Sequence, residues 1–205
     1  MIVVVTGTGT EVGKTYITAA VGRALRARGV DVAARKPVQS FTEGDATTDA
    51  DVLAAATGER TETVCPAQRR LPVAMAPPMA AAALGRPPFT IADLVAELDA
   101  PAGAIVLVEG AGGLRSPLTD DGDTLALTDA LSPTLVVLVA DAGLGTINLV
   151  RLCSDALAAH RVVVYLNRFD AGDDLHLRNR EWLVTRDGLD VVTDVEALTA
   201  LLLPV

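Results

Sequence analysis

The stretch that decides the fold class opens the chain: Ile2-Val3-Val4-Val5-Thr6-Gly7-Thr8-Gly9-Thr10-Glu11-Val12-Gly13-Lys14-Thr15. An apolar run, a glycine-rich loop and a Gly-Lys-Thr ending before a helical pattern are typical of a phosphate-binding loop. Glycines let backbone N–H groups turn toward phosphate oxygens, and the next helix offers its free N-terminal N–H groups and positive dipole end. The sequence therefore predicts nucleotide binding, with Lys14 at the outer phosphates and Thr15 on Mg²⁺.

The glycine spacing of this loop departs from the common pattern. Five residues separate Gly7 from Gly13, and three separate Gly9 from Gly13, whereas the usual loop has four between its first glycine and the Gly-Lys pair. The alternative interpretation is a glycine-rich turn that joins a strand to a helix and binds nothing. The Gly-Lys-Thr ending and the flanking strand and helix favour a variant phosphate loop.

Apolar, β-branched runs alternate with helical patterns along the rest of the chain. Continuous apolar runs without polar alternation are typical of parallel strands covered on both faces. We therefore expect an α/β fold of the P-loop NTPase type, with a mainly parallel central sheet and helices on both faces, in a single domain of residues 1–205. The expected strands are 2–5, 30–34, 104–108, 135–139 and 162–166 with a weak edge strand at 191–192, and the expected helices are 15–28, 49–57, 91–98, 147–159 and 195–203, with a short helical piece at 79–84 inside a loop of residues 65–88.

Composition narrows the range of partners. A net charge of −9 leaves no excess of cations to meet nucleic-acid phosphates, so no nucleic-acid partner is expected. No apolar run approaches the ~18 residues of a membrane span, and Met1 leads directly into a strand, so neither a membrane anchor nor a signal peptide is expected. Cys65 and Cys153 are far apart and form no CxxC pair, so the reducing cytoplasm is the expected compartment. The two histidines have no metal-ligand spacing with these cysteines.

Polar or glycine-rich groups follow each of the five expected strands. In open parallel sheets, ligands bind outside the carboxyl ends of the strands, so these groups should converge on one rim. Lys36 after the second strand would concentrate positive charge beside Lys14, and Glu109 after the third is placed for Mg²⁺ or its water. Asp45, Asp49 and Asp51 enter a helix, and any one of them could join the metal or serve the helix dipole instead. Asp120, Asp121 and Asp123 are expected to form a solvated turn.

Four segments in order resemble the dethiobiotin synthetase family of ATP-dependent ligases in biotin synthesis. They are Gly7-Thr8-Gly9-Thr10-Glu11-Val12-Gly13-Lys14-Thr15, Lys36-Pro37-Val38-Gln39-Ser40, Val108-Glu109-Gly110-Ala111-Gly112-Gly113 and Leu144-Gly145-Thr146-Ile147-Asn148. The five-residue loop spacing is a habit of this family, and the similarity covers roughly residues 1–167. The resemblance implies an enzyme that carboxylates 7,8-diaminopelargonate with CO₂ and closes a ureido ring at the expense of ATP, as a cytoplasmic homodimer that needs Mg²⁺. The apolar stretch 75–84 is a candidate dimer contact.

The resemblance also implies roles for individual residues. Lys36, Lys14 and Thr10 would be catalytic, and Thr15, Asp49 and Glu109 would hold the metal; Thr48-Asp49-Ala50 matches the family's acidic motif better than the context of Asp51. The diamine would contact Thr10, Lys36, Ser40 and Gly112. The nucleotide would be bound by Glu11, Val12, Gly13, Lys14, Thr15, Tyr16, Asp49, Glu109, Gly110, Ala111, Gly112, Asn167 and Arg168.

Several departures from the family pattern leave alternatives open. Arg168 stands where the family often has Asp, and no Gly-x-Ile/Leu-Pro segment follows, so CTP and GTP remain alternatives to ATP. A regulatory ATPase of the partition or metal-insertase kind is a rival reading, but such proteins carry an extra lysine early in the loop, where this chain has Thr6, Gly7 and Thr8. An amidotransferase-type synthase module is a second rival, and it would need a glutaminase domain.

Overall fold

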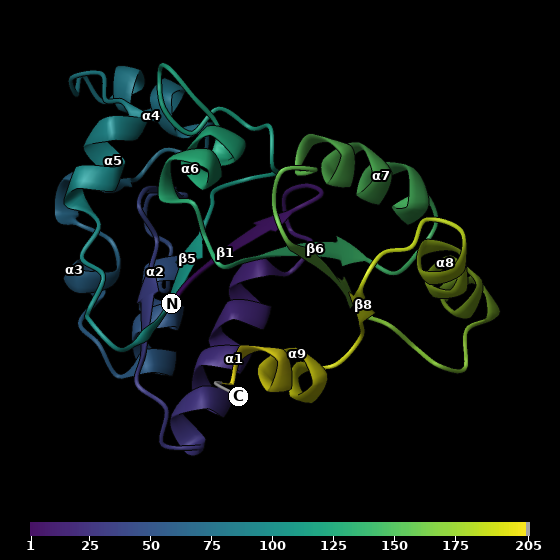
Figure 1. Cartoon of the computed structure of the whole chain (residues 1–205). Helices are drawn as coiled ribbons and strands as arrows, with labels where there is room; N and C mark the ends of the chain where they lie inside the picture. Colours follow the sequence, from purple (N-terminus) through teal and green to yellow (C-terminus); the bar gives the residue numbers. More distant parts are fainter. Residues whose placement is uncertain (204–205) are drawn as a thin grey trace.

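Six parallel strands form the central sheet of the protein, in the order β2-β5-β1-β6-β7-β8 (Figure 1). The structure is a computed structural model that describes residues 1–203, so the last two residues of the expected domain lie outside the described part. Neighbouring strands of the central sheet all pair in parallel. The strands are β1 (Ile2–Gly7), β2 (Val32–Arg35), β5 (Ile105–Glu109), β6 (Leu135–Asp141), β7 (Val162–Asn167) and β8 (Val191–Val192).

The predicted sheet is confirmed, including the weak edge strand at 191–192. Strand β5 is buried at every position, and β1 and β6 are buried along nearly all of their lengths. Such strands need no polar alternation because helices cover both faces of the sheet. A second, two-stranded parallel sheet, which was not predicted from the sequence, joins β3 (Gln39–Ser40) to β4 (Arg70–Leu71).

One face of the sheet is covered by α1 (Lys14–Ala27) and α9 (Val195–Leu202). Side chains of β1 that point to this face, Val3 and Val5, pack with Ile17 of α1 and Leu198 of α9. The helices α2 (Asp49–Thr57) and α3 (Thr61–Val64) extend this layer beside α1. Helix α2 therefore begins close to the carboxyl end of β2, which matters for the site below.

The opposite face is covered by α5 (Ile91–Glu97), α6 (Thr124–Leu131), α7 (Thr146–Ala156) and α8 (Asp174–Thr185). Val4 of β1 belongs to a core cluster with Leu94 of α5 and Leu127 of α6. Leu138 of β6 packs in a second cluster with Leu183 of α8. The alternation of Val3, Val4 and Val5 between opposite faces confirms the predicted helices on both sides.

Three helices were absent from the sequence prediction: the single turn α3, and the longer helices α6 and α8. Helix α6 begins at Thr124 and is capped by Asp123, whose carboxylate accepts a hydrogen bond from the Ala126 N–H at 3.0 Å. The expected solvated turn is thus only partly right: Asp120 and Asp121 are exposed, but Asp121 also accepts from the Ile91 N–H, and Asp123 is a helix cap. Helix α8 is capped in the same way by Asp173 and is polar over most of its length, which hid its period.

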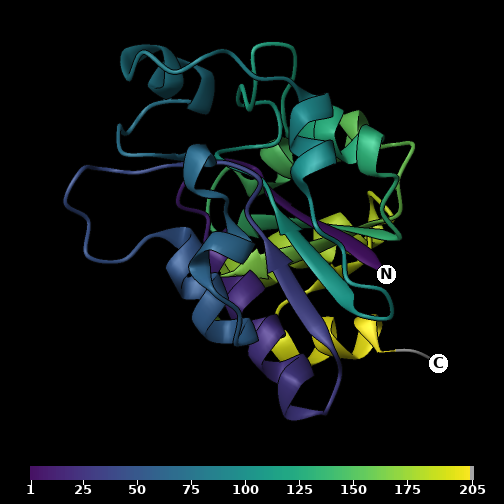
Figure 2. The ribbon, with the colours of Figure 1, turned by 90° about the vertical axis from the view of Figure 1, so that its left-hand side faces the viewer.

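The expected loop of residues 65–88 contains more order than predicted. It holds a 3₁₀ turn (Ala67–Arg69), β4 and α4 (Pro77–Ala83), where a helical piece was expected at 79–84. Figure 2 shows that α4 and the segment between β3 and α2 extend from the same side of the sheet. Within residues 1–203, no helix combines the length and apolar character needed to cross a bilayer.

The packing of α9 on α1 makes a prediction about stability. Leu198 is 1% exposed, whereas Leu201 of the same helix is 44% exposed. We expect Leu198→Ala to lower the free energy of unfolding by about 2–5 kcal/mol, because it removes buried methyl groups and leaves a cavity. Leu201→Ala is the matched control, with an expected change within about 0.5 kcal/mol. Denaturant unfolding of both variants checks this; equal losses would contradict the packing of α9.

Candidate active site

The loop after β1 leaves the first turn of α1 open to an anion. Gly13, the N-cap of α1, has φ 100°, and a Cβ placed there would lie 2.1 Å from Asn167 Nδ2, so only glycine fits. No side chain caps α1, and its first turn contains no acidic residue. The free N–H groups and the positive end of the helix dipole therefore remain available for phosphate oxygens.

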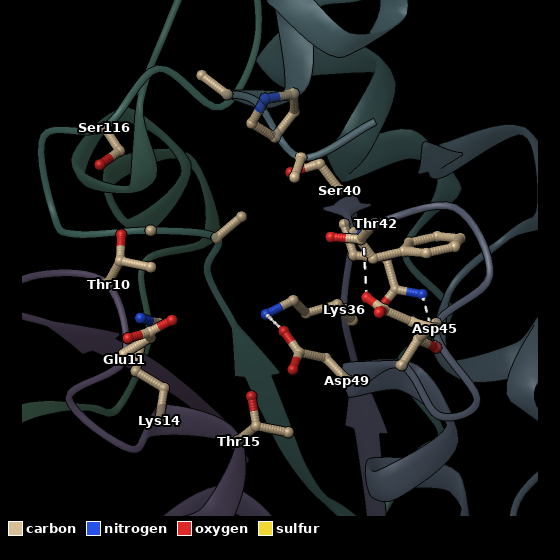
Figure 3. Close-up of a pocket in the computed structure, with 18 of the residues that line it drawn as sticks. Thr10, Glu11, Lys14, Thr15, Lys36, Ser40, Thr42, Asp45, Asp49 and Ser116 are labelled. Carbon is tan, nitrogen blue, oxygen red and sulfur yellow. Dashed lines mark hydrogen bonds and ion pairs between the residues drawn. The ribbon is translucent and has the colours of Figure 1, made fainter. Parts of the chain in front are cut away.

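Lys36 is the centre of a buried ionic network at the carboxyl end of the sheet. Its Nζ lies 2.7 Å from Asp49 Oδ2 (Figure 3). The same Nζ lies 2.6 Å from Glu109 Oε1 and donates to the Gly110 carbonyl at 3.1 Å. The Lys36 side chain is 2% exposed and the Glu109 side chain is fully buried. Since unpaired buried charges are costly, each group depends on its partner.

The charges in this network shift the pKa values of its members. Burial alone would lower the pKa of Lys36, but Glu109 and Asp49 outweigh it and raise that pKa above the usual lysine value. Burial would raise the pKa of Asp49, yet the charge and hydrogen bond of Lys36, with help from Thr15 and Lys14, lower it. Lys36 is therefore a fixed cation and Asp49 a fixed anion at neutral pH.

The pKa of Lys14 shifts in the opposite direction from that of Lys36. Burial and the nearby Lys36 charge lower its pKa to about 8, against the smaller pull of Glu109 and Asp49. Its ammonium donates to the Gly9 carbonyl at 3.0 Å. Two lysines of different protonation behaviour thus face the same space.

A cleft of about 650 Å³ opens above these groups. That volume is within the usual range for small-molecule sites. Residues from the β1 loop, from the segments after β2 and β5, and from the start of α2 share its wall, as the rim of strand ends predicted. The expected site residues that line it are Thr10, Glu11, Gly13, Lys14, Thr15, Tyr16, Lys36, Ser40, Asp49, Ala111 and Gly112.

Asp49 and Asp51 differ clearly in their surroundings. Asp49 faces Lys36 at the floor of the cleft, whereas the Asp51 carboxylate accepts from the backbone and hydroxyl of Thr48 and from the Thr61 hydroxyl. Asp51 forms the capping box of α2 and does not line the cleft. Asp45 lies in the cleft wall, where its carboxylate accepts from the Thr42 N–H.

Three oxygen-bearing side chains converge where a divalent cation could bind. The Thr15 hydroxyl donates to Glu109 Oε1 at 2.7 Å, and it also lowers the pKa of Asp49 by a hydrogen bond. The second carboxylate oxygen of Glu109, Oε2, is buried and has no protein partner. Within residues 1–203, no three His, Cys, Asp or Glu side chains lie close enough together to hold a metal ion by themselves. The donor set suits Mg²⁺, which usually keeps waters and phosphate oxygens beside one or two carboxylates.

Asn167 and Arg168 lie behind the loop instead of in the cleft. The Asn167 amide donates to the Val12 carbonyl at 2.9 Å, and the Arg168 guanidinium donates to the Glu11 carbonyl at 3.0 Å. Arg168, a non-glycine residue with φ 58°, also pairs with Asp141 at the end of β6. These contacts connect β6 and β7 to the loop, on the side away from Lys36. Val12, Glu109 and Gly110 do not line the cleft either.

One wall of the cleft is formed by residues that were not predicted from the sequence. Ser40, an expected substrate contact, donates from its hydroxyl to the Met75 carbonyl at 2.5 Å. Met75 was considered only as part of a dimer contact, yet it lines the cleft with Pro77. Ser116, opposite, accepts from the Gly113 N–H at 3.0 Å. The only sequence signal for this wall was the Pro- and Ala-rich composition of residues 65–88, which predicts a loop and no ligand.

Known sequences resemble this chain over most of its length. A family model described as an AAA domain matches residues 2–201. A Mycobacterium tuberculosis (strain ATCC 25177 / H37Ra) protein named ATP-dependent dethiobiotin synthetase is 45% identical over 167 residues, covering 78% of this chain and 70% of the relative. A protein of the same name from Mycobacteroides abscessus is 37% identical over 210 residues, covering 99% of this chain and 90% of the relative.

Solved structures share the fold at low sequence identity. The septum site-determining protein MinD from Pyrococcus horikoshii, complexed with Mg-ADP, has a TM-score of 0.52 and 18% identity, covering 94% of this chain and 78% of that one. Chloroplast FtsY from Physcomitrella patens has a TM-score of 0.51 and 17% identity, covering 99% of this chain and 65% of that one. At this level of identity the likeness concerns the fold alone.

The two lysines of the cleft are the only lysines in the sequence, which makes their protonation directly measurable. With ¹³C at the lysine ε-carbons, we expect one NMR signal to titrate near pH 8, as Lys14, and the other to stay charged well above that pH. An anionic phosphate favours the ammonium form, so tripolyphosphate should raise the lower midpoint, and its binding above pH 8 should take up a proton. Lys14→Arg should remove the signal with the lower midpoint. Two midpoints near pH 10.5 would contradict the difference in pKa between Lys14 and Lys36.

Proposed function

Because the chain belongs to the AAA-domain family and, within it, to the ATP-dependent dethiobiotin synthetases, we propose that its cleft carries out the synthetase reaction. The protein is an ATP-dependent ligase that forms C–N bonds. The observation that carries the site assignment is the Lys36 network, which lies between the phosphate loop and the wall that bears Ser40. The substrates are a diamine, 7,8-diaminopelargonate, with CO₂ and ATP.

The proposed reaction has three steps. One amine of the diamine attacks CO₂ and loses a proton, which gives a carbamate. A carbamate oxygen attacks the γ-phosphorus of ATP and ADP leaves, which gives a mixed carbamic–phosphoric anhydride. The second amine attacks the carbamoyl carbon and loses a proton, phosphate leaves and the ureido ring of dethiobiotin closes. Negative charge thus develops at the carbamate and at the transferring phosphoryl group, and stabilising both is the task of the site.

The cations of the cleft suit this charge distribution. We assign Lys14 to the outer phosphates and Lys36 to the carbamate and the transferring group, because both ammonium groups face the same cleft. Thr10 and Ser40 place hydroxyl oxygens in the wall of the cleft, and with Gly112 they would hold the diamine in line with the phosphoryl group. Such positioning can remove a large part of the activation barrier in two-substrate reactions. The mechanism needs no covalent nucleophile on the protein.

Mg²⁺ is the proposed metal, held by Thr15, Asp49 and Glu109. The buried, unpartnered Oε2 of Glu109 and the Asp49 carboxylate beside Lys36 support this assignment. When bound, the metal would neutralise phosphate charge and orient the triphosphate. Residues Glu11 to Tyr16 would supply the backbone donors, and Gly110 to Gly112 would border the nucleotide from the other side.

Base recognition is assigned to Asn167 and Arg168, which contact the loop from the side opposite Lys36. ATP is the nucleotide of the family, while CTP and GTP remain open for this chain because Arg168 departs from the family pattern. We also propose a homodimer that acts in the cytoplasm with no nucleic-acid partner, in keeping with two free cysteines and a net charge of −9. Sedimentation velocity measures the oligomer.

One assay tests the function. Purified protein is incubated with 7,8-diaminopelargonate, labelled bicarbonate and MgATP, and phosphate and ring-bound label are measured. A synthetase releases phosphate only with the diamine and places one label in the ring for each phosphate. Nucleotide turnover that is indifferent to the diamine would instead support the regulatory ATPase, and would overturn the proposal.

Lys36 provides the sharpest mutational test. We expect Lys36→Met to lower kcat by at least ~10²-fold, the usual effect of removing one charge-stabilising group. The substitution strands the buried Glu109 carboxylate, so the double variant Lys36→Met/Glu109→Gln serves as a second test that leaves no unpaired charge. Circular dichroism checks that both fold. Near-normal turnover by either variant would remove Lys36 from the mechanism.

Asp49 and Asp51 can be separated by their metal dependence. We expect Asp49→Asn to raise the Mg²⁺ concentration for half-maximal activity by about tenfold or more, since it removes a charged ligand. Asp51→Asn should affect mainly stability, by about 1 kcal/mol, because its carboxylate caps α2. Mg²⁺ titrations of initial rate distinguish the two; the reverse ranking would assign the metal to Asp51.

A further inference from the structure

Gln39 is a buried amide in the cleft wall to which the reaction assigns no task. It is the first residue of β3, three positions after Lys36, and is 2% exposed. Its Nε2 donates to the Thr48 hydroxyl at 3.1 Å, and its Oε1 accepts from the Ala50 N–H at 2.9 Å. Both ends of the amide are therefore used, and both point to the start of α2.

The two partners of Gln39 flank Asp49. Thr48 precedes it and Ala50 follows it, so the amide holds the backbone on either side of the residue whose carboxylate lies 2.7 Å from Lys36 Nζ. The direction of each bond is fixed. The Ala50 N–H can only donate, so the oxygen of the Gln39 amide faces it. The Thr48 hydroxyl donates its one hydrogen to Asp51 at 2.7 Å, so it accepts the hydrogen bond from Gln39 Nε2.

The chain before α2 offers no comparable support. Residues 42–47 are all exposed, and the Asp49 side chain itself is 46% exposed. The segment from Lys36 to Gln39 is only four residues long and starts at the end of β2. It therefore carries the lysine at one end and, at the other, the amide that holds the lysine's carboxylate partner.

We propose that Gln39 is a positioning residue that fixes Asp49 relative to Lys36 and thereby sets the geometry of the metal-binding carboxylate. This inference rests on the proposed function for its catalytic meaning. In the ligand-free protein, loss of the amide would loosen the first turn of α2, and Asp49 would lose its fixed position. The diamine is held by other residues, so its KM is expected to stay near the wild-type value.

The experiment compares Gln39→Met, which keeps the length and loses both hydrogen bonds, with wild type. Hydrogen exchange of the Ala50 amide in the ligand-free protein should speed up by about tenfold, the effect of losing one buried hydrogen bond. The Kd for Mn²⁺ in the presence of ADP, measured by electron paramagnetic resonance, should rise by a similar factor. Neither readout requires ligase activity, so both remain readable if the synthetase assay fails.

Thr61→Val is the matched control, because it removes a hydrogen bond to Asp51 on the same helix end, away from the cleft. We expect it to leave the Mn²⁺ Kd unchanged. An equal rise of the Mn²⁺ Kd in both variants would mean that Gln39 only stabilises α2 in general, and it would overturn the proposal. An unchanged Ala50 exchange rate or Mn²⁺ Kd in Gln39→Met would overturn it as well.

Gln39→Glu adds a test that depends on pH. A protonated carboxyl at this position can donate to Thr48 and accept from Ala50, as the amide does, whereas a carboxylate cannot donate. Lowering the pH should therefore bring the Mn²⁺ Kd of Gln39→Glu closer to that of wild type measured at the same pH. A ratio of the two Kd values that is independent of pH would contradict the two-ended role of the amide.

Discussion

The buried ion pair between Lys36 and Glu109 is the interaction on which the rest of the site depends. Glu109 is fully enclosed at the end of a central strand, and its charge is acceptable there only because the Lys36 ammonium lies 2.6 Å away. Asp49 completes the group from α2, and Lys14 adds a second cation from the phosphate loop. Two ammonium groups and two carboxylates nearly cancel one another, so an incoming polyphosphate meets a site whose polar groups are already in place.

The parallel sheet explains why these groups meet. Lys36 follows β2, Glu109 ends β5, and Lys14 follows the loop after β1, and these three strands are neighbours in the order β2-β5-β1. Residues that are 73 positions apart in sequence therefore form a hydrogen bond. The strands that follow, β6 and β7, contribute Asp141 and Asn167 at the same rim, but these contact the back of the loop. The site thus divides into a front with the ionic network and a rear with supporting contacts.

The strands, the phosphate loop, Lys36 and Glu109 could be predicted because each is encoded locally, by an apolar run and the residues directly after it. Helix α8 could not, since its residues are mostly polar and only Leu183 and Asn179 are buried. Asp123 was predicted to lie in an acidic turn because its role as a helix cap can be recognised only when the start of α6 is known. The wall formed by Met75, Pro77 and Ser116 arises from tertiary contacts between loops, and the pairing of Gln39 with α2 depends on a fold that brings residues 39 and 50 together.

The raised basicity of Lys36 has a consequence for the chemical durability of the enzyme. A mixed carbamic–phosphoric anhydride is an acylating agent, and the group that attacks it most readily is a neutral amine. Lys36 would stand nearest to it in the proposed mechanism, but its two carboxylate partners keep its nitrogen protonated and without a lone pair. Every other basic side chain except Lys14 and the two histidines is an arginine, a poor nucleophile. The same ion pairs that prepare the site for charge would therefore protect Lys36 from acylation by the intermediate.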